Sequence, residues 1–361
     1  MNSPKITSKA PPGWRKNALA KSLGNYSFIF IFLFIFATFL ITNSGALTVS
    51  GAFNILRHSV VVGIIALGMG LVIITGGIDL SVGSMLAIIS GLSVDVFNAT
   101  NSTFVTLLFA LAMGIVCGLL NGILVGRVKM PAFIATLGTM MIYRSLAQYY
   151  LRATAGVSRR SIFNMDGTLS AYANFYGFGQ AKVFSVVPVV GLVLIAAVIV
   201  MVFVSTSTKF GKQVYAIGSN ERAAQLAGVN VARTRVLVFV VTGLLCGLAS
   251  FLGLAMQGSV DPATIGKSNE MYAIAAVVIG GISMSGGKGK LLGVLFGALS
   301  YTSIDKIIAA LKLDALINDT IKGSILLVAV LVQLMIPVLR AKIKKLFKSS
   351  KADGGSAPDS P

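Results

Sequence analysis

The chain has 361 residues, of which 55% are hydrophobic and only 11% are charged. Soluble domains carry about 25% charged residues, so this composition excludes an ordinary soluble protein and indicates a membrane protein. The formal net charge of +19 is not accompanied by a nucleic-acid recognition module, and we therefore expect no nucleic-acid partner. Cys117 and Cys246 both lie in apolar segments, which implies neither a disulfide framework nor a metal site.

The apolar segments predict an all-α polytopic membrane protein. The first apolar run begins at Tyr26, and no small-residue cleavage site follows it closely, so we expect a retained first span behind a cytoplasmic segment 1–26. A span needs about 20 apolar residues. About ten transmembrane helices are expected, at 27–44, 54–75, 81–98, 103–126, 131–151, 184–204, 236–256, 271–287, 290–310 and 321–338.

The basic residues predict the orientation of these spans. An even number of spans places both termini on one side, and twenty of the thirty Lys and Arg residues lie in the segments of that side. The positive-inside tendency therefore puts both termini in the cytoplasm. The long outer segment 152–183 also carries basic residues, although long loops follow this rule less strictly. The transmembrane domain covers 27–340, and the small, polar cytoplasmic tail 341–361 is expected to be disordered.

The largest polar segment on the inner side is the loop 205–235. Ser219 or Asn220 can cap a short helix from Glu221 to Ala227, and Gly228 can end that helix in the left-handed conformation. These residues predict a stiff peg of about two turns. An ordinary capped loop helix without a further role is the alternative interpretation.

Two similar stretches, GGIDLSVGSM at 76–85 and GGISMSGGKG at 280–289, predict an internal repeat. Each stands at a junction of two expected spans, and Gly-interrupted helices at matching positions indicate a pathway in transporters. By the span count the copies run in the same direction, and they are inverted if one junction is a half-crossing loop. Chance similarity of Gly-rich helix ends is the alternative. The candidate residues for helix breaks and the translocation path are Gly76, Gly77, Asp79, Ser81, Ser84, Gly280, Gly281 and Ser283.

Asp79 is a carboxylate inside a nearly unbroken apolar run. Two successive glycines each lower helix propensity by about 1 kcal/mol relative to Ala, and a helix break frees backbone amides that need new partners. We expect Asp79 to accept these amides as a helix N-cap, with Ser81 and Ser84 sharing the task. Direct contact with a polar solute, or an interfacial position without a special role, are the alternatives.

Four motifs occur in a fixed order: TGGIDLSVGS, MPAFIATLGTM, FGKQVYAIGSNERAAQLAGVNV and VVIGGISMSGGKG. Together they resemble the permease subunits of bacterial ATP-binding-cassette (ABC) importers for ribose, galactose, xylose and related monosaccharides, over about residues 28–340. The resemblance implies a type II ABC importer-like permease fold in the bacterial inner membrane. It also implies a second permease subunit, identical or different, cytoplasmic ABC ATPases, a periplasmic sugar-binding protein and contact with membrane lipid.

The same resemblance implies that the loop 205–235 is the segment that couples to the ATPase. Its residues Ala223, Ala224 and Gly228 match the pattern A-A-x-x-x-G of permease coupling helices, and Ser219 and Asn220 precede them. Where that family often has Glu before the two alanines, this chain has Arg222 after Glu221, and both charges are expected to pair with the ATPase.

This chain lacks a phosphate-binding loop of the G-x-x-x-x-G-K-[ST] type, so it is expected to be a transport subunit rather than an enzyme. It is expected to bind no cofactor or metal, with ATP and Mg²⁺ held by the partner ATPase. An ion-coupled secondary carrier and a passive channel are the alternatives. The motifs do not choose among pentoses, hexoses, autoinducer-2, polyols and branched-chain amino acids as the solute.

Overall fold

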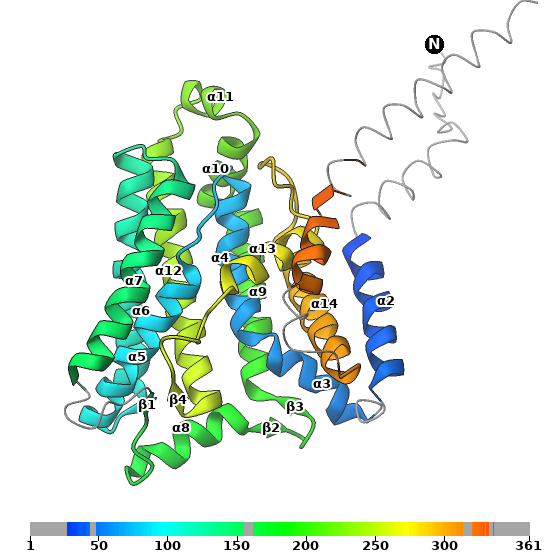
Figure 1. Ribbon diagram of the computed structural model, residues 1–361. Coiled ribbons are helices and arrows are strands. Elements are labelled where there is room, and N and C mark those ends of the chain that lie inside the picture. Colours follow the sequence, from blue (N-terminus) through cyan, green and yellow to red (C-terminus); the bar gives the residue numbers. More distant parts are fainter. Residues whose placement is uncertain are drawn as a thin grey trace, which may run out of the picture.

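The computed structural model describes residues 27–43, 48–154, 162–312, 320–328, 330, 331 and 335. The predicted N-terminal segment 1–26, the tail 341–361 and part of the expected span 321–338 lie outside the described residues. The described chain is mostly helical, and its helices run up and down between two ends (Figure 1). This confirms the prediction of an all-α polytopic membrane protein.

We call the end that carries α11 the peg end, and the end that carries α8 the opposite end (Figure 1). The longer helices are α2 (Ser27–Thr42), α4 (Val60–Ile74), α5 (Val82–Thr100), α6 (Thr103–Gly122), α7 (Ala132–Thr154), α9 (Val189–Ser207), α12 (Val231–Gln257) and α14 (Leu291–Ala310). A π-helical turn, η2 (Ile123–Arg127), extends α6. The shorter helices are α3 (Val49–His58), α8 (Ser170–Gln180), α10 (Lys209–Ser219), α11 (Glu221–Leu226) and α13 (Asn269–Ile279).

Two pairs of short antiparallel strands lie with α8 at the opposite end (Figure 1). The first pair joins β1 (Phe163–Asn164) to β4 (Ser259–Val260), with Phe163 opposite Val260. The second joins β2 (Lys182–Val183) to β3 (Val187–Pro188). The described part of the predicted outer segment 152–183 and the predicted inner loop 205–235 therefore lie at opposite ends of the helices.

The count of ten spans is not confirmed. In the described part of the chain, five helices are long and apolar enough to cross a membrane, and α3 with α4 adds a sixth if this pair, bent by 47°, is one span. The expected span 271–287 is wrong as a continuous helix, because α13 has only 11 residues. It ends where Gly281 adopts a left-handed φ of 83°, a conformation that stops helices.

The centre of the molecule is built on α4 and α12. Nearly all of α4 is buried, and α12 packs closely along α6. A β-carbon at Gly114 would lie 2.2 Å from the carbonyl oxygen of Gly243, and one at Gly243 would lie 2.1 Å from the carbonyl oxygen of Gly114. The backbones of α6 and α12 are therefore in direct contact, as small residues permit between membrane helices.

Two helices begin near the middle of the molecule rather than at an end (Figure 1). The segment 75–81 enters from the peg end before α5, and the segment 258–268 enters from the opposite end before α13. Gly83 and Gly266 mark the place where they meet. A β-carbon on either residue would lie 2.2 Å from the carbonyl oxygen of the other. These two broken spans run in opposite directions, an inverted pair that the comparison of 76–85 with 280–289 does not reveal.

Candidate functional site

The predicted peg is held by three helix caps in succession. The side chains of Thr208, Asn220 and Asn230 cap α10, α11 and α12, and each accepts a hydrogen bond from a backbone amide three residues on. The Asn220 side-chain oxygen lies 3.0 Å from the Ala223 nitrogen. Asn220 is therefore the capping residue of the two that the sequence allowed, and Ser219 is the last residue of α10.

The end of α11 follows the prediction. Gly228 adopts a left-handed φ of 81°, and its amide donates to the Gln225 carbonyl at 3.0 Å. The Val229 amide donates to the Ala224 carbonyl at 3.0 Å, which completes a Schellman-type ending. A β-carbon at Gly228 would meet nothing within 4 Å, so this position needs Gly for its backbone conformation and not for space.

The two alanines of the peg have different environments. Ala224 is buried in a small apolar cluster with Ile217 and Val231, so its size serves the peg's own core. Ala223 is exposed. Leu226 is 91% exposed on the same short helix, and the sequence analysis did not single it out. Its signal in the sequence is a large apolar residue on a short helix that otherwise carries small, charged and amide side chains.

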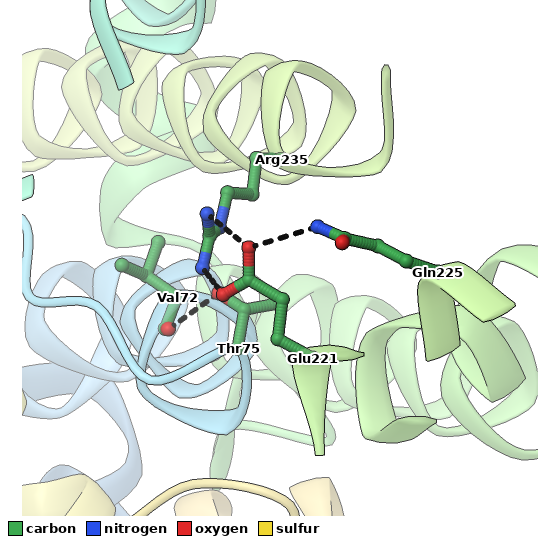
Figure 2. A network of polar contacts seen from close by, with 5 residues as sticks. All are labelled: Val72, Thr75, Glu221, Gln225 and Arg235. Atoms are coloured by element: carbon green, nitrogen blue, oxygen red, sulfur yellow. Dashed lines mark hydrogen bonds and ion pairs between the residues drawn. The ribbon is translucent and has the colours of Figure 1, made fainter. Parts of the chain in front are cut away.

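Glu221 has a partner within the chain that the sequence did not reveal. Its carboxylate pairs with Arg235 in the first turns of α12, with oxygen–nitrogen distances of 2.7 and 3.2 Å (Figure 2). Gln225 donates a long hydrogen bond of 3.4 Å to the same carboxylate. Glu221 therefore ties α11 to α12, whereas Arg222 is exposed and forms no hydrogen bond or ion pair with the described residues.

Breaking this ion pair should have a small effect. The Arg235 side chain is 27% exposed and the Glu221 side chain 40% exposed, and pairs of this kind contribute about 0.2–1 kcal/mol. We expect Glu221→Gln to lower the unfolding temperature slightly in detergent, and the charge reversal E221R/R235E to restore it. Arg222→Gln is the matched control and should have no effect. A loss that the reversal does not restore would assign Glu221 another role.

The end of α10 meets both helix breaks. We call this contact the backbone junction, formed by Ile74, Gly218 and Gly287. The Gly287 amide donates to the Ile74 carbonyl at 2.9 Å. A β-carbon at Gly218 would lie 1.7 Å from the Ile74 oxygen and 2.6 Å from the Gly287 nitrogen. The peg is therefore continuous with a helix end that touches the end of α4, just before the first repeated stretch, and Gly287 within the second. The sequence analysis missed Gly218 and Gly287.

A hydrogen bond from a side chain strengthens this arrangement. The Tyr215 hydroxyl in α10 donates to the Gly289 carbonyl at 2.9 Å. The loop that follows α13 is closed by a hydrogen bond of 3.0 Å from the Ser283 amide to the Lys288 carbonyl. Ser283, a predicted pathway residue, thus holds the shape of the loop that contacts α10.

The two repeated stretches match in a different register from the one that the sequence suggested. At the end of α4, the Gly77 amide donates to the Val72 carbonyl at 3.0 Å, and at the end of α13 the Ile282 amide donates to the Val277 carbonyl at 3.1 Å. The left-handed residues are Gly76, with φ 82°, and Gly281, with φ 83°. Gly76 therefore corresponds to Gly281, one residue beyond the match of the two Gly pairs.

Gly280 has another role. It is buried, and a β-carbon there would lie 2.5 Å from the Gly293 carbonyl oxygen. Its missing side chain lets the end of α13 pack directly on the first turn of α14. The second Gly pair thus combines a packing residue with a helix-ending residue.

Asp79 lies in a buried polar cluster. Its Oδ1 accepts hydrogen bonds from the Ser81 amide at 2.9 Å and from the Ser81 hydroxyl at 2.7 Å. The Asn121 side-chain nitrogen donates to the Ser81 hydroxyl at 2.8 Å. The carboxylate accepts a freed amide, as expected, but the N-cap position of α5 belongs to Ser81. Ser84 is buried in the first turn and does not share the task.

Replacing Asp79 should destabilise the protein. Asp79→Ala leaves the Ser81 amide and hydroxyl without their acceptor, and each buried unsatisfied group costs about 1–3 kcal/mol. Asp79→Asn keeps an acceptor oxygen and should cost less. Thermal unfolding in detergent measures both, with Ser84→Ala as the control in the same helix turn. If Asp79→Ala unfolds at the wild-type temperature, the carboxylate does not hold this helix start.

A cavity of about 410 Å³ lies beside the first break. Gly76 and Gly77 line it together with Lys129 and with Arg235, the partner of Glu221 in the peg. The predicted pathway residues Asp79, Ser81 and Ser84 do not line this cavity and are at most 2% exposed. The break therefore has a cavity-lining part at Gly76 and Gly77 and a buried structural part at Asp79.

Arg144 is a residue that the sequence analysis missed. It lies in the middle of α7, and its guanidinium donates to the carbonyls of Pro262 at 2.9 Å, Ile265 at 2.6 Å and Gly83 at 3.3 Å. It thus holds together the two broken spans where they meet. The signal was present, because a charged residue in the middle of an expected span is rare and marks a functional or structural site.

Comparisons with known proteins agree with this architecture. The protein family described as the branched-chain amino acid transport system / permease component matches residues 51–332. The ribose import permease protein of Escherichia coli (strain K12) is 36% identical over 286 residues, which cover 79% of this chain and 86% of that protein. The xylose transport system permease protein of Haemophilus influenzae (strain ATCC 51907 / DSM 11121 / KW20 / Rd) is 32% identical over 358 residues, covering 84% and 94%.

A third relative is named for a different solute. The autoinducer 2 import system permease protein of Enterobacter sp. (strain 638) is 34% identical over 295 residues, which cover 82% of each chain. No solved structure matches the chain significantly. The chain belongs to the family described as the permease component of the branched-chain amino acid transport system, and it is a permease subunit of the ABC-importer type rather than an enzyme.

Proposed function

We propose that this chain forms the translocation path of an ATP-driven importer for a monosaccharide of the ribose type. Relatives named for ribose and xylose support this class of solute. A periplasmic binding protein would deliver the sugar, and separate ABC ATPases would bind ATP and Mg²⁺ and dock on α11. A second permease subunit, identical or different, would complete the path.

The observation that carries this proposal is the backbone junction. It links α10 to the end of α4 and to the loop that follows α13, through Gly218, Ile74 and Gly287. A partner bound to α11 would therefore move both helix breaks together. The cap at Asn220 fixes α11 to α10, and the ion pair of Glu221 fixes it to α12. A packed contact of this kind shifts between discrete arrangements instead of bending continuously, as alternating access requires.

The orientation follows from the same proposal. The peg end would face the cytoplasm of a bacterium, and the end with α8 would face the periplasmic binding protein, across the inner membrane. The start of α2 lies toward the peg end (Figure 1), which supports a cytoplasmic N-terminus on the same side as the ATPase. The excess of Lys and Arg in the predicted inner segments supports this direction.

The solute class has a direct test. In proteoliposomes that contain this permease, its ATPase and its binding protein, stimulation of ATP hydrolysis by solute would be compared for ribose, xylose, autoinducer-2 and a branched-chain amino acid. The proposal expects a pentose to stimulate most strongly. Stimulation by a branched-chain amino acid, as the family description suggests, or by autoinducer-2, as for one relative, would replace the sugar while keeping the ATP-driven mechanism.

A further inference from the structure

Helix α7 is long enough to cross a membrane but is not apolar enough. Its 23 residues make it longer than three of the five helices that meet both conditions in the described part of the chain, yet it is not one of them. Its charged and amide residues all lie in the half toward the opposite end. Ser145, Gln148 and Arg152 are spaced by three and four residues there, which places them on one face of the helix. We call this face the polar stripe.

The side chains of the polar stripe have no partner in the protein's own core. All three are exposed and form no hydrogen bond or ion pair with the described residues. Other polar residues of α7 behave differently. Thr136 and Thr139 are buried and donate to backbone carbonyls of the same helix at 2.8 and 3.2 Å. Arg144 donates to three carbonyls of the two broken spans. The polar stripe therefore presents free donors and acceptors to whatever lies outside this chain.

The polar stripe reaches the depth of the membrane interior. Ser145 lies nine residues before Thr154, the last residue of α7, which is about 14 Å along the helix. Gln148 lies six residues, or about 9 Å, before the same end. A hydrocarbon core is about 30 Å thick, so both positions fall inside it. Polar groups without partners are strongly disfavoured in lipid. Water or polar groups of another molecule are therefore the favoured neighbours of this face.

The place of α7 in the fold connects the polar stripe with the first helix break. α7 packs mainly on α5, and its Thr136 hydroxyl accepts a hydrogen bond of 3.1 Å from the Leu80 amide in the break. The first residue of α7, Ala132, lines the cavity of about 410 Å³ together with Gly76 and Gly77. One end of α7 thus borders the cavity at the break, and the other end carries the polar stripe.

We propose that the polar stripe lines the outer part of the translocation path, and that Ser145 and Gln148 bind the hydroxyl groups of the solute in transit. This inference rests on the proposed function. A monosaccharide is uncharged and carries several hydroxyls, each of which donates and accepts hydrogen bonds. The Ser145 hydroxyl and the Gln148 amide supply both kinds of partner without a charge. Arg152 lies two residues before the helix end, at the mouth of the path.

The reactivity of introduced cysteines tests whether the polar stripe is in water. In the full-length permease in nanodiscs, Ser145→Cys and Gln148→Cys should react with a membrane-impermeant methanethiosulfonate at least about tenfold faster than Ile199→Cys, because a thiol in apolar surroundings ionises less. Ile199 is the matched control, because it is 64% exposed on the apolar helix α9, ten residues from its start at the opposite end. Wild type sets the blank, since Cys117 and Cys246 are buried.

A second variant tests contact with the solute. Gln148→Leu should lower ATP-driven uptake of ribose by the complete system about twofold to tenfold, the effect of losing one hydrogen bond to a neutral hydroxyl. Gln148→Asn keeps the amide and should retain more of the uptake. Ile199→Leu is the control and should transport like wild type.

Three results would contradict the proposal. If Ser145→Cys and Gln148→Cys react as slowly as Ile199→Cys, lipid covers the polar stripe. If oxidation cross-links two copies of Ser145→Cys that do not react with the reagent, the polar stripe is a contact between permease subunits. Fast labelling together with wild-type uptake by Gln148→Leu would mean a water-filled space that the solute does not touch.

The labelling distinguishes failure of this inference from failure of the proposed function, because it needs neither ribose nor ATP. Slow labelling in a permease whose ATPase is stimulated by ribose would remove the role of the polar stripe alone. Fast labelling in a system that ribose does not stimulate would keep the path and replace the sugar.

Discussion

Gly218→Ala should lower transport strongly while the peg itself stays folded. The added β-carbon would lie 1.7 Å from the Ile74 oxygen and 2.6 Å from the Gly287 nitrogen, and both of these are backbone atoms that cannot rotate away. The junction must therefore open. We expect a loss of about 1–3 kcal/mol in the free energy of unfolding. ATP-driven uptake should fall about tenfold or more, because losing about 1.4 kcal/mol of coupling free energy between the peg and the breaks corresponds to tenfold.

The control for this variant is Gly138→Ala in α7. A β-carbon at Gly138 meets nothing within 4 Å, so the same chemical change has room there. Uptake into proteoliposomes and ATPase stimulation would be measured for both variants. The essential comparison is coupling: Gly218→Ala should retain ATPase binding and lose stimulation by solute. If Gly218→Ala transports like Gly138→Ala, the junction does not transmit motion from the peg to the breaks.

Leu226→Ala should weaken docking of the ATPase without destabilising the permease. Leu226 is 91% exposed on α11, so its removal costs the isolated chain almost no buried surface. In a complex, an exposed apolar side chain at the tip of a peg fits the pattern of a central anchor, whose loss costs about 2 kcal/mol, or roughly 30-fold in Kd.

The matched control is Phe184→Ala. Phe184 is also apolar and is 92% exposed, but it lies between β2 and β3 at the opposite end. The affinity of the purified ATPase for each variant in nanodiscs measures the difference. Wild-type affinity for Leu226→Ala, or equal weakening by both substitutions, would show that α11 does not anchor the ATPase through this residue.

The sequence predicted the peg closely because its structure depends on local chemistry. Asn220 caps α11 by accepting a hydrogen bond from the Ala223 amide in the first turn, and Gly228 ends this helix through its own backbone conformation. Neither feature needs a distant partner. The ion pair of Glu221 was not predicted for the opposite reason, because its partner Arg235 lies on the next helix and the pairing depends on how α11 folds back against α12.

The helix breaks were found at the right places, but their register was not. Two adjacent Gly residues look alike in a sequence, yet Gly281 ends α13 and Gly280 packs on Gly293. The inverted pair of broken spans was also missed, because its contact between Gly83 and Gly266 joins segments that share no motif. Contacts of this kind are decided by tertiary packing and leave no periodic signal.

In this account, nucleotide hydrolysis in a separate ATPase drives the conformational change of the permease through contacts with α11. Uptake of labelled ribose into proteoliposomes tests it most directly, with this chain alone and with its ATPase and binding protein. The account predicts uptake only from the complete system with ATP, and none by the chain alone under a proton or sodium gradient. Gradient-driven uptake by the chain alone would contradict the account.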